Sequence, residues 1–326
     1  MATIKEVAKQ AGISVATVSR VLNGNGYVKE STREKVLQVI KEMDYVPNSI
    51  AISLNNKKTR TIGLLLPDIT NPFFAELAKG VEQVAKEKGY TVILCNSYED
   101  QQNEIEHVQM LEQKFIDGLI MASNTFSPEQ LSRIKVPVVL IDRVMEEHIS
   151  SVTSKNYDGA ILAMNHLLDH GCKKIAHICG PLSIVTAKQR LQGYLDVAKE
   201  QKWFAESLIE NGNYEIESGF SATIKLLQGN PDIDGIFAGN DLMAVGCLKA
   251  LHSLKRKVPE EIAVIGFDGI NFSKITIPEL TTIAQPIIEM GLVATSIIID
   301  QIEGTLTENV VRELEIKIIE RESTKR

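Results

Sequence analysis

Apolar residues recur at helical spacing three times within the first 45 residues. The first helix is predicted to begin at a capping box, Thr3 to Glu6, and to end at Gly12. Ser14 is placed to cap a second helix, and another capping box, Ser31 to Glu34, predicts the start of a third. The apolar positions of the three helices are Val7, Ala8, Ala11, Val15, Val18, Val21, Leu22, Val36, Val39, Ile40 and Met43. Helices joined by so short a glycine-containing turn favour a helix-turn-helix, although generic packing of three helices would give the same periodicity.

From Thr61 onward, apolar β-rich runs alternate with helical patterns. The expected strands are Ile62–Leu66, Thr91–Cys95, Gly118–Met121, Val138–Ile141, Lys174–Ile178, Gly235–Ala238 and Ala263–Phe267. The expected helices are Phe74–Lys88, Asn103–Gln113, Gly159–Asp169, Thr186–Glu200, Phe220–Leu227 and Asp241–Leu254. Such alternation is typical of a parallel, doubly wound α/β sheet. Because this segment is long for one set of layers, we expect two lobes.

The residues that follow the predicted strands share a chemistry. Ligands of doubly wound sheets bind beyond the carboxyl ends of the strands. The side chains expected there are two aromatic rings with a set of amide, carboxylate and guanidinium groups: Asn71, Phe73, Phe74, Asp142, Arg143, Arg190, Asn240, Asp268 and Gln285. A sugar has C–H faces that stack on rings, and hydroxyls that need both donors and acceptors. Any single residue could merely cap a helix or a turn, but the whole set favours sugar binding.

Charge is divided unevenly along the chain. Residues 1–60 hold ten Lys and Arg against five Asp and Glu, a net charge of +5, so with −7 overall the remainder carries −12. A small basic segment joined to a large acidic body is the asymmetry expected of a DNA-binding module attached to a domain that does not touch DNA.

The cysteines and the distribution of apolar residues indicate the cellular compartment. The four cysteines include no CxxC pair and lie in or beside apolar runs, so we interpret them as buried thiols in a reducing compartment. No apolar run approaches the roughly 20 residues of a membrane span, and the N-terminus shows no apolar signal sequence. We therefore expect a cytoplasmic bacterial protein, associated with the nucleoid, with no membrane contact.

The first 23 residues carry a family signature. Thr3-Ile-Lys-Glu-Val-Ala, followed by Gly12-Ile-Ser-Val-Ala-Thr-Val-Ser-Arg-Val-Leu-Asn23, closely resembles the headpiece of the lactose/galactose repressor family. The resemblance implies that the second helix enters the major groove, with Val15 and Ala16 reading base edges and Arg20 engaging guanine. It assigns phosphate contacts to the short polar residues Ser14, Thr17, Ser19 and Asn23.

Residues 47–60 resemble the hinge helix and linker of the same family. Pro47 blocks continuation of the third helix, and the run 48–54 is too short to be helical alone in water. The resemblance implies a hinge that orders on DNA, with Ala51 and Leu54 at the minor groove and Leu54 as the inserted wedge. A plain linker is the alternative.

Residues 61–326 resemble periplasmic sugar-binding proteins fused to such a headpiece, and are most similar to ribose-binding proteins and ribose operon repressors. The resemblance matches the ligand set residue by residue and adds Tyr214, where those proteins have phenylalanine. The implied fold is an all-α helix-turn-helix headpiece plus an α/β periplasmic-binding-protein-like core of two doubly wound lobes. The implied segments are a headpiece over 1–46, a hinge over 47–60 and a core over 61–326, with one lobe at about 61–156 plus 287–314 and the other at about 157–286 plus 315–326.

The resemblance implies a sequence-specific transcriptional repressor. It would be a homodimer on pseudo-palindromic operator DNA, controlled by a small-molecule effector, with D-ribose as the inducer of a ribose operon. A dimer is expected because no leucine heptads follow Glu320. The alternative within the family is a catabolite-control regulator that uses a phosphorylated carrier protein as corepressor.

Other classes of protein are disfavoured. The basic headpiece argues against a transport binding protein, and an enzyme is not expected, since no nucleophile elbow, dinucleotide fingerprint or P-loop is present. No cofactor or metal is expected either. His166 and His170 form an i, i+4 pair, but without a third ligand we interpret them as surface histidines flanking a helix end.

Overall fold

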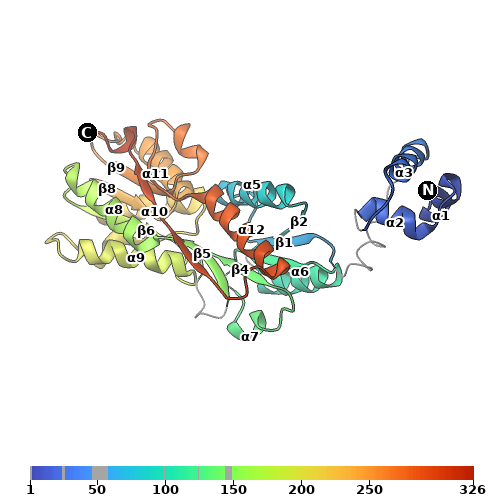
Figure 1. Cartoon of the computed structure of the whole chain (residues 1–326). Coiled ribbons are helices and arrows are strands. Elements are labelled where there is room, and N and C mark those ends of the chain that lie inside the picture. Colours follow the sequence, from blue (N-terminus) through green and yellow to red (C-terminus); the bar gives the residue numbers. More distant parts are fainter. Residues whose placement is uncertain (1, 24–25, 46–57, 99, 124, 144–148) are drawn as a thin grey trace. The chain divides into compact units, whose positions relative to one another are not determined.

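The computed structural model describes residues 2–23, 26–45, 58–98, 100–123, 125–143 and 149–326, which fall into two units, Met1–Thr59 and Arg60–Arg326 (Figure 1). The N-terminal unit contains α1 (Ile4–Ala11), α2 (Val15–Asn23) and α3 (Glu30–Glu42). The capping box of α1 is confirmed, because Thr3 Oγ1 accepts from the Glu6 amide at 3.4 Å and a Glu6 carboxylate oxygen accepts from the Thr3 amide at 2.8 Å. Gly12 ends α1 in the left-handed region with φ 66°.

The prediction of a second capping box, from Ser31 to Glu34, is wrong. Helix α3 begins at Glu30, and Lys29 holds the cap position without a side-chain hydrogen bond. The backbone of Lys29 turns into the helix first, and its carbonyl accepts from the amides of Thr32 and Arg33 at 2.8 and 3.0 Å. Ser31 therefore already lies inside the first turn. The three helices enclose a core of apolar side chains that comprises Val7, Ala8, Ala11, Val18, Val21, Val36, Val39 and Tyr45.

Two six-stranded sheets organise the C-terminal unit, and each defines a lobe. The first-lobe sheet has the order β11-β5-β4-β3-β1-β2, from β1 (Thr61–Leu66), β2 (Thr91–Asn96), β3 (Gly118–Met121), β4 (Val138–Ile141), β5 (Ser150–Ser154) and β11 (Val311–Leu314). The second-lobe sheet has the order β12-β10-β9-β8-β6-β7, from β6 (Ile175–Cys179), β7 (Ile209–Asn211), β8 (Gly235–Ala238), β9 (Ala263–Asp268), β10 (Thr281–Ala284) and β12 (Lys317–Ile319). Every pairing is parallel except that of β12 with β10. The expectation of two doubly wound lobes is confirmed.

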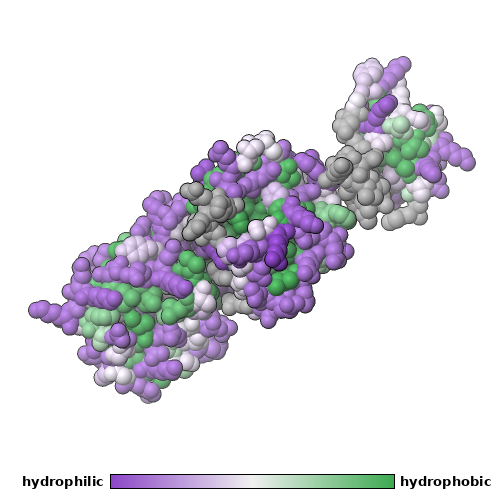
Figure 2. All heavy atoms as spheres, turned by 90° about the horizontal axis from the view of Figure 1, so that it is seen from below, coloured by the Kyte–Doolittle hydropathy of each residue, from purple (hydrophilic) through white to green (hydrophobic). Residues whose placement is uncertain are grey.

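Helices cover both faces of each sheet, which explains why the central strands are buried throughout. In the first lobe, α5 (Pro72–Glu87) and α12 (Ile287–Glu303) pack on one face, while α6 (Gln101–Gln113) and α7 (Pro128–Leu131) pack on the other. In the second lobe, α8 (Asn156–Asp169) and α9 (Val185–Ala198) oppose α10 (Ile216–Gly229) and α11 (Asp241–Ser253). Among the described residues, no helix has the length and apolarity that crossing a membrane requires. Hydrophilic residues cover most of the face shown in Figure 2.

The sequence pattern did not predict several of the observed elements. Strand β5 reads Ser-Ser-Val-Thr-Ser and is fully buried, although it has one large apolar residue. Strands β7, β11 and β12 are short edge elements, and α12 is too uniformly apolar to show a helical period. Burial of these segments is decided by their neighbours in space.

The chain crosses between the lobes three times, after β5, after β10 and after β11. The first and third crossovers are tied together, because the Lys155 amide donates to the carbonyl of Leu314 at 3.2 Å and Lys155 Nζ lies 2.5 Å from Glu315 Oε1. Gln285 belongs to the second crossover. These segments lie where any movement of one lobe against the other must bend the chain.

The C-terminal residues pack on the second lobe through η3 (Glu322–Thr324). Ser323 Oγ donates to the carbonyl of Val264 at 2.6 Å, and Thr324 Oγ1 lies 2.8 Å from His166 Nε2. The interpretation of two surface histidines without a third potential ligand is therefore wrong. His166 is buried beneath this segment, and Glu320 lies beside His170. The four cysteines are free and buried, as expected.

Candidate functional site

A cavity of about 1000 Å³ lies between the two lobes at the carboxyl ends of their strands. Both lobes contribute to its walls, as parallel sheet topology requires. Nine of the ten predicted ligand residues line it: Asn71, Phe73, Phe74, Asp142, Arg190, Tyr214, Asn240, Asp268 and Gln285. We call it the inter-lobe cavity.

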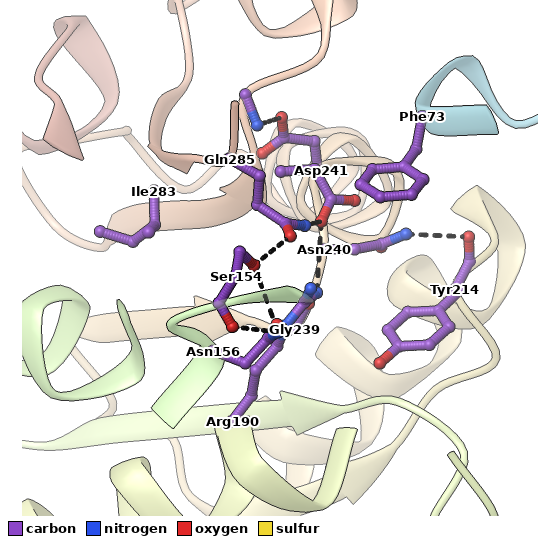
Figure 3. Close-up of polar contacts among 12 residues, drawn as sticks. Phe73, Ser154, Asn156, Arg190, Tyr214, Gly239, Asn240, Asp241, Ile283 and Gln285 are labelled. Carbon is purple, nitrogen blue, oxygen red and sulfur yellow. Dashed lines mark hydrogen bonds and ion pairs between the residues drawn. The ribbon is translucent and has the colours of Figure 1, made fainter. Parts of the chain in front are cut away.

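The first lobe supplies the aromatic wall. Asn71 Oδ1 accepts from the Phe73 amide at 3.1 Å and caps α5, and Pro72 follows at the first helical position. The cap fixes the start of the helix, so the next two side chains project at the cavity. The Phe73 and Phe74 rings meet edge to face, with centroids 5.1 Å apart and planes at 85°. In Figure 3, Phe73 points toward the polar groups of the second lobe.

Arg190 is the centre of the polar wall. It is 4% exposed, and Nε donates to Asn156 Oδ1 at 2.8 Å while Nη1 donates to the carbonyl of Gly239 at 2.6 Å and to Asp268 Oδ1 at 3.3 Å (Figure 3). Its Cζ lies 3.8 Å from the centroid of the Phe267 ring. Stacking and three hydrogen bonds hold this charge in one orientation. Within the described residues, Nη2 makes no hydrogen bond, so it remains available as a donor.

Two carboxylates face this guanidinium. Burial raises the pKa of Asp268 to about 6, against the opposing effects of Arg190 and of the Gln285 amide, which donates to Asp268 Oδ1 at 2.7 Å. Burial likewise raises the pKa of Asp142 to about 6, although Arg190 lowers it. Asp142 Oδ1 is buried without a hydrogen-bond partner among the described residues. An acceptor left without a donor is costly unless a ligand satisfies it.

Tyr214 presents a second unsatisfied group. Its Oη is buried and makes no hydrogen bond of good geometry within the described part of the chain, although Thr186 lies near enough to lower its pKa. Burial outweighs this effect and raises the pKa of Tyr214 to about 12, so the hydroxyl is neutral. Asn240 Nδ2 donates to the carbonyl of Tyr214 at 3.2 Å (Figure 3). Its Oδ1 caps α11 by accepting from the Met243 amide at 2.8 Å. Asn240 is therefore both a helix cap and a wall of the cavity.

Backbone strain is concentrated at the same site. Asp142, Tyr214 and Asp268 have positive φ values of 55°, 59° and 115°. Each such conformation costs about 1–3 kcal/mol in a residue other than glycine and persists only where the surroundings impose it. Strain at three polar residues of one cavity is typical of a binding site.

The structure does not bring Arg143 into the inter-lobe cavity. Its side chain lines a separate cavity of about 1120 Å³ beside α7 and the end of α12, and its Nη1 is buried without a hydrogen-bond partner among the described residues. Sequence reasoning also missed Glu104 and Thr186, which do line the inter-lobe cavity. Glu104 is 1% exposed and accepts from the hydroxyls of Ser97, Ser123 and Thr125. Nothing in its helical context distinguishes it from a surface glutamate.

A hydrogen-bonded chain joins the cavity to two of the crossovers. Ser154 Oγ donates to Gln285 Oε1 at 2.5 Å, and the carbonyl of Ser154 accepts from Asn156 Nδ2 at 3.0 Å (Figure 3). Asn156 and Gln285 in turn contact Arg190 and Asp268. A ligand that displaces Arg190 or Asp268 therefore also displaces the hydrogen-bonded segments that connect the lobes.

The N-terminal unit exposes one end of α2. Val15 is 40% exposed and Ala16 and Arg20 are also exposed, while Val18 and Val21 fill the core. Ser14 Oγ accepts from the Thr17 amide at 3.2 Å, so Ser14 caps α2. Ser19 is half-buried. Ala51, Leu54 and the side chain of Asn23 lie outside the described residues.

Two family models match the chain. One, described as bacterial regulatory proteins of the lacI family, matches residues 3–48. The other, described as periplasmic binding proteins and sugar binding domain of the LacI family, matches residues 59–322. Together they cover both units.

Individual proteins give the same picture. A ribose operon repressor of Halalkalibacterium halodurans is 43% identical over 100% of this chain and 98% of its own length. The lac repressor dimer bound to operator and the anti-inducer ONPF superimposes with a TM-score of 0.89 at 27% identity, covering 99% of each chain. A transcriptional regulator of Enterococcus faecium with bound ribose gives a TM-score of 0.71 at 29% identity, covering 81% of this chain and 98% of its own.

Proposed function

This chain belongs to the LacI family of bacterial regulatory proteins, and we propose that it is a DNA-binding transcriptional repressor that D-ribose releases from its operator. The composition of the cavity walls is the observation that supports a sugar as the effector. The inter-lobe cavity pairs an aromatic wall with a buried Arg190–Asp268 pair and with unsatisfied polar atoms on Asp142 and Tyr214. Buried polar atoms without hydrogen-bond partners destabilise the empty cavity, and a polyhydroxylated ligand supplies those partners.

The chemistry of the walls suits a sugar. The rings of Phe73 and Phe74 offer apolar surface to C–H groups. Carboxylates accept from hydroxyls, and guanidinium and amide groups donate to them, so each hydroxyl can be satisfied in both directions. The ribose operon repressor similarity and the ribose-bound relative favour D-ribose within the sugar class. We keep Arg143 as a candidate ligand residue, because its buried Nη1 gains a partner if the side chain turns toward the cavity.

The N-terminal unit binds the operator in this proposal. Val15 and Ala16 read base edges and Arg20 engages guanine, while Ser14, Thr17, Ser19 and Asn23 contact phosphates. Ala51 and Leu54 act at the minor groove as part of a hinge over 47–60, between a headpiece over 1–46 and a core over 61–326. Two copies bind as a homodimer, so the operator is pseudo-palindromic. The protein acts in the cytoplasm at the nucleoid, and it regulates rather than catalyses.

Ligand and operator are coupled through the crossovers. Ribose draws the lobes together around Arg190 and Asp268, and the hydrogen bonds through Ser154, Asn156 and Gln285 transmit that closure to the connecting segments. Such coupling is typically about 1–3 kcal/mol and is reciprocal, so operator must weaken ribose binding by the factor by which ribose weakens operator binding. The polar cavity favours this small-molecule control over control by a phosphorylated carrier protein.

Isothermal titration with D-ribose, glucose, galactose and a purine tests the effector. We expect saturable heat with ribose alone, and loss of it in Asp142→Asn, whereas Asp158→Asn, an exposed change on α8, binds as the parent does. Heat with another ligand only would replace ribose and keep the repressor. Silence with all four would reject a small-molecule effector of these classes and call for a pull-down with a phosphorylated carrier protein.

A further inference from the structure

The C-terminal end of α8 places His166, in its last turn, and His170, at its cap, next to a carboxylate. His166 and His170 lie one helical turn apart, with ring centroids 4.0 Å from each other. The segment after β12 brings in Glu320, whose Oε1 lies 3.8 Å from His170 Nε2. One potential ligand atom from each of the three residues lies within 4.8 Å of the other two. The residues are distant in sequence, so only the fold assembles them.

We propose that His166, His170 and Glu320 form a binding site for a divalent transition metal of the zinc type. Zinc binds imidazole nitrogen and carboxylate oxygen at about 2.0–2.2 Å, which puts neighbouring ligand atoms of a tetrahedral site roughly 3.4 Å apart. Here His170 Nε2 and Glu320 Oε1 lie 3.8 Å apart and the three ligand atoms lie within 4.8 Å of one another, so the side chains must draw closer to bind an ion, and Glu320 is exposed enough to rotate inward. Two imidazoles with one carboxylate suit zinc, cobalt or nickel better than magnesium or calcium. A water molecule completes the coordination.

One nitrogen of each imidazole is hydrogen-bonded, as in ligating histidines, and the other is left as the ligand atom. His170 Nδ1 lies 2.8 Å from the carbonyl of His166, which can only accept, so Nδ1 carries the hydrogen and Nε2 offers its lone pair on the side of Glu320. His166 Nε2 lies 2.8 Å from Thr324 Oγ1, which itself lies 2.8 Å from Thr281 Oγ1. Partners of this kind fix the tautomer and the ring orientation of ligating histidines.

An ion pair between His170 and Glu320 alone accounts for this cluster less well than a bound metal ion does. His170 and Glu320 are too far apart for a hydrogen bond, and a partly exposed pair of this kind contributes little stability. His166 takes no part in that ion pair, and the polar partner of its side chain on the C-terminal segment is Thr324. A bound ion would instead connect all three side chains and fasten the C-terminal segment to α8. None of the three lines the inter-lobe cavity, so metal binding is independent of the effector.

The test uses the full-length, tag-free protein after treatment with a chelator. Isothermal titration with zinc chloride should show one ion per chain, and the unfolding temperature should rise with zinc concentration. His170→Ala and Glu320→Gln should each weaken zinc binding by about tenfold or more. His252→Ala removes an exposed histidine from α11 of the same lobe and should bind zinc as the parent does. Both test positions are partly exposed, so the variants keep the fold, which circular dichroism checks.

Cobalt(II) identifies the ligand atoms. Binding at this site gives visible d–d bands without the near-ultraviolet charge-transfer band of a thiolate, and His170→Ala removes them. A thiolate band would assign the metal to the cysteines and overturn the proposal. So would the absence of saturable zinc binding, or equal zinc affinity in the parent, His170→Ala and Glu320→Gln.

Discussion

Gly180 and Tyr214 fit together so closely that a Cβ on Gly180 would lie 2.2 Å from Cζ of Tyr214. Gly180 directly follows β6, and the missing side chain is what lets the tyrosine ring lie against the strand end. The ring can move only away from this contact. The position of the unsatisfied Tyr214 hydroxyl therefore depends on a glycine that contributes no side chain to the site.

Gly180→Ala should displace the Tyr214 ring and weaken ribose binding by about tenfold or more, since a misplaced wall disturbs every hydroxyl contact. Gly229→Ala is the matched control, because nothing lies within 4 Å of its added Cβ. Titration calorimetry on both variants measures the effect. Equal ribose affinity in the two would remove Tyr214 from the site.

Asp268→Asn should abolish measurable ribose binding and lower the free energy of unfolding by about 3–5 kcal/mol, because it removes the carboxylate that forms the ion pair with the buried Arg190 guanidinium. Denaturant unfolding measures the loss. A variant as stable as the parent would mean that the carbonyl of Gly239 and Asn156 suffice to hold this charge.

Ribose affinity should fall as the pH drops through about 6. Asp142 and Asp268 have pKa values raised to about 6 by burial, and a hydroxyl donates a stronger, charge-assisted hydrogen bond to the ionised form. Below that pH, binding must first expel a proton, which costs up to about tenfold in affinity per pH unit for each carboxyl. Calorimetry at about pH 5 and about pH 7.5 checks the sign. Affinity that is constant or rises at low pH would exclude these carboxylates as acceptors.

Ser154→Ala should alter the coupling between ribose and operator by about 0.5–2 kcal/mol, because it removes the hydrogen bond to Gln285 at the crossovers. Ser296→Ala is the control, since Ser296 is exposed on α12 and donates only to the carbonyl of Leu292. Operator titrations with and without ribose give the coupling. An identical ratio in the parent and both variants would rule out this route.

Arg20→Ala should cost about 1–3 kcal/mol of operator binding and relax the preference for one base pair. Lys41→Ala removes an equal charge from an exposed position on α3 and should weaken binding to all sequences slightly. Fluorescence anisotropy on an operator selected from random duplexes, and on its single-base variants, separates the two effects. A uniform loss in Arg20→Ala would reduce its role to phosphate contact.

Parallel sheet geometry explains why so much of the cavity could be predicted from sequence. The carboxyl ends of neighbouring parallel strands lie at one edge of a sheet, so Asn240 and Asp268 could be expected together in the second lobe, and Asp142 at the corresponding edge of the first. Arg143 obeys the same rule but its side chain turns into a neighbouring cavity, because position along the chain does not determine the rotamer. The direction of a side chain depends on packing that the pattern does not contain.

Other parts of the fold depend on contacts between distant segments. Strand β5 is buried because β4 and β11 flank it, although its own residues are mainly serine and threonine. His166 is covered, and Glu320 reaches His170, only because the chain's last residues return to α8. The pattern of apolar and polar residues along the chain does not show which distant segments pack together in the fold.

The measurement that tests the proposed function most directly is the affinity for a selected operator at increasing ribose concentration. Ribose at concentrations that saturate the cavity should weaken operator binding by about 5–150-fold, the factor expected for typical coupling. The reverse titration should show ribose affinity lowered by the same factor when operator is bound. Operator affinity that stays constant while ribose fills the cavity would contradict control of this repressor by the sugar.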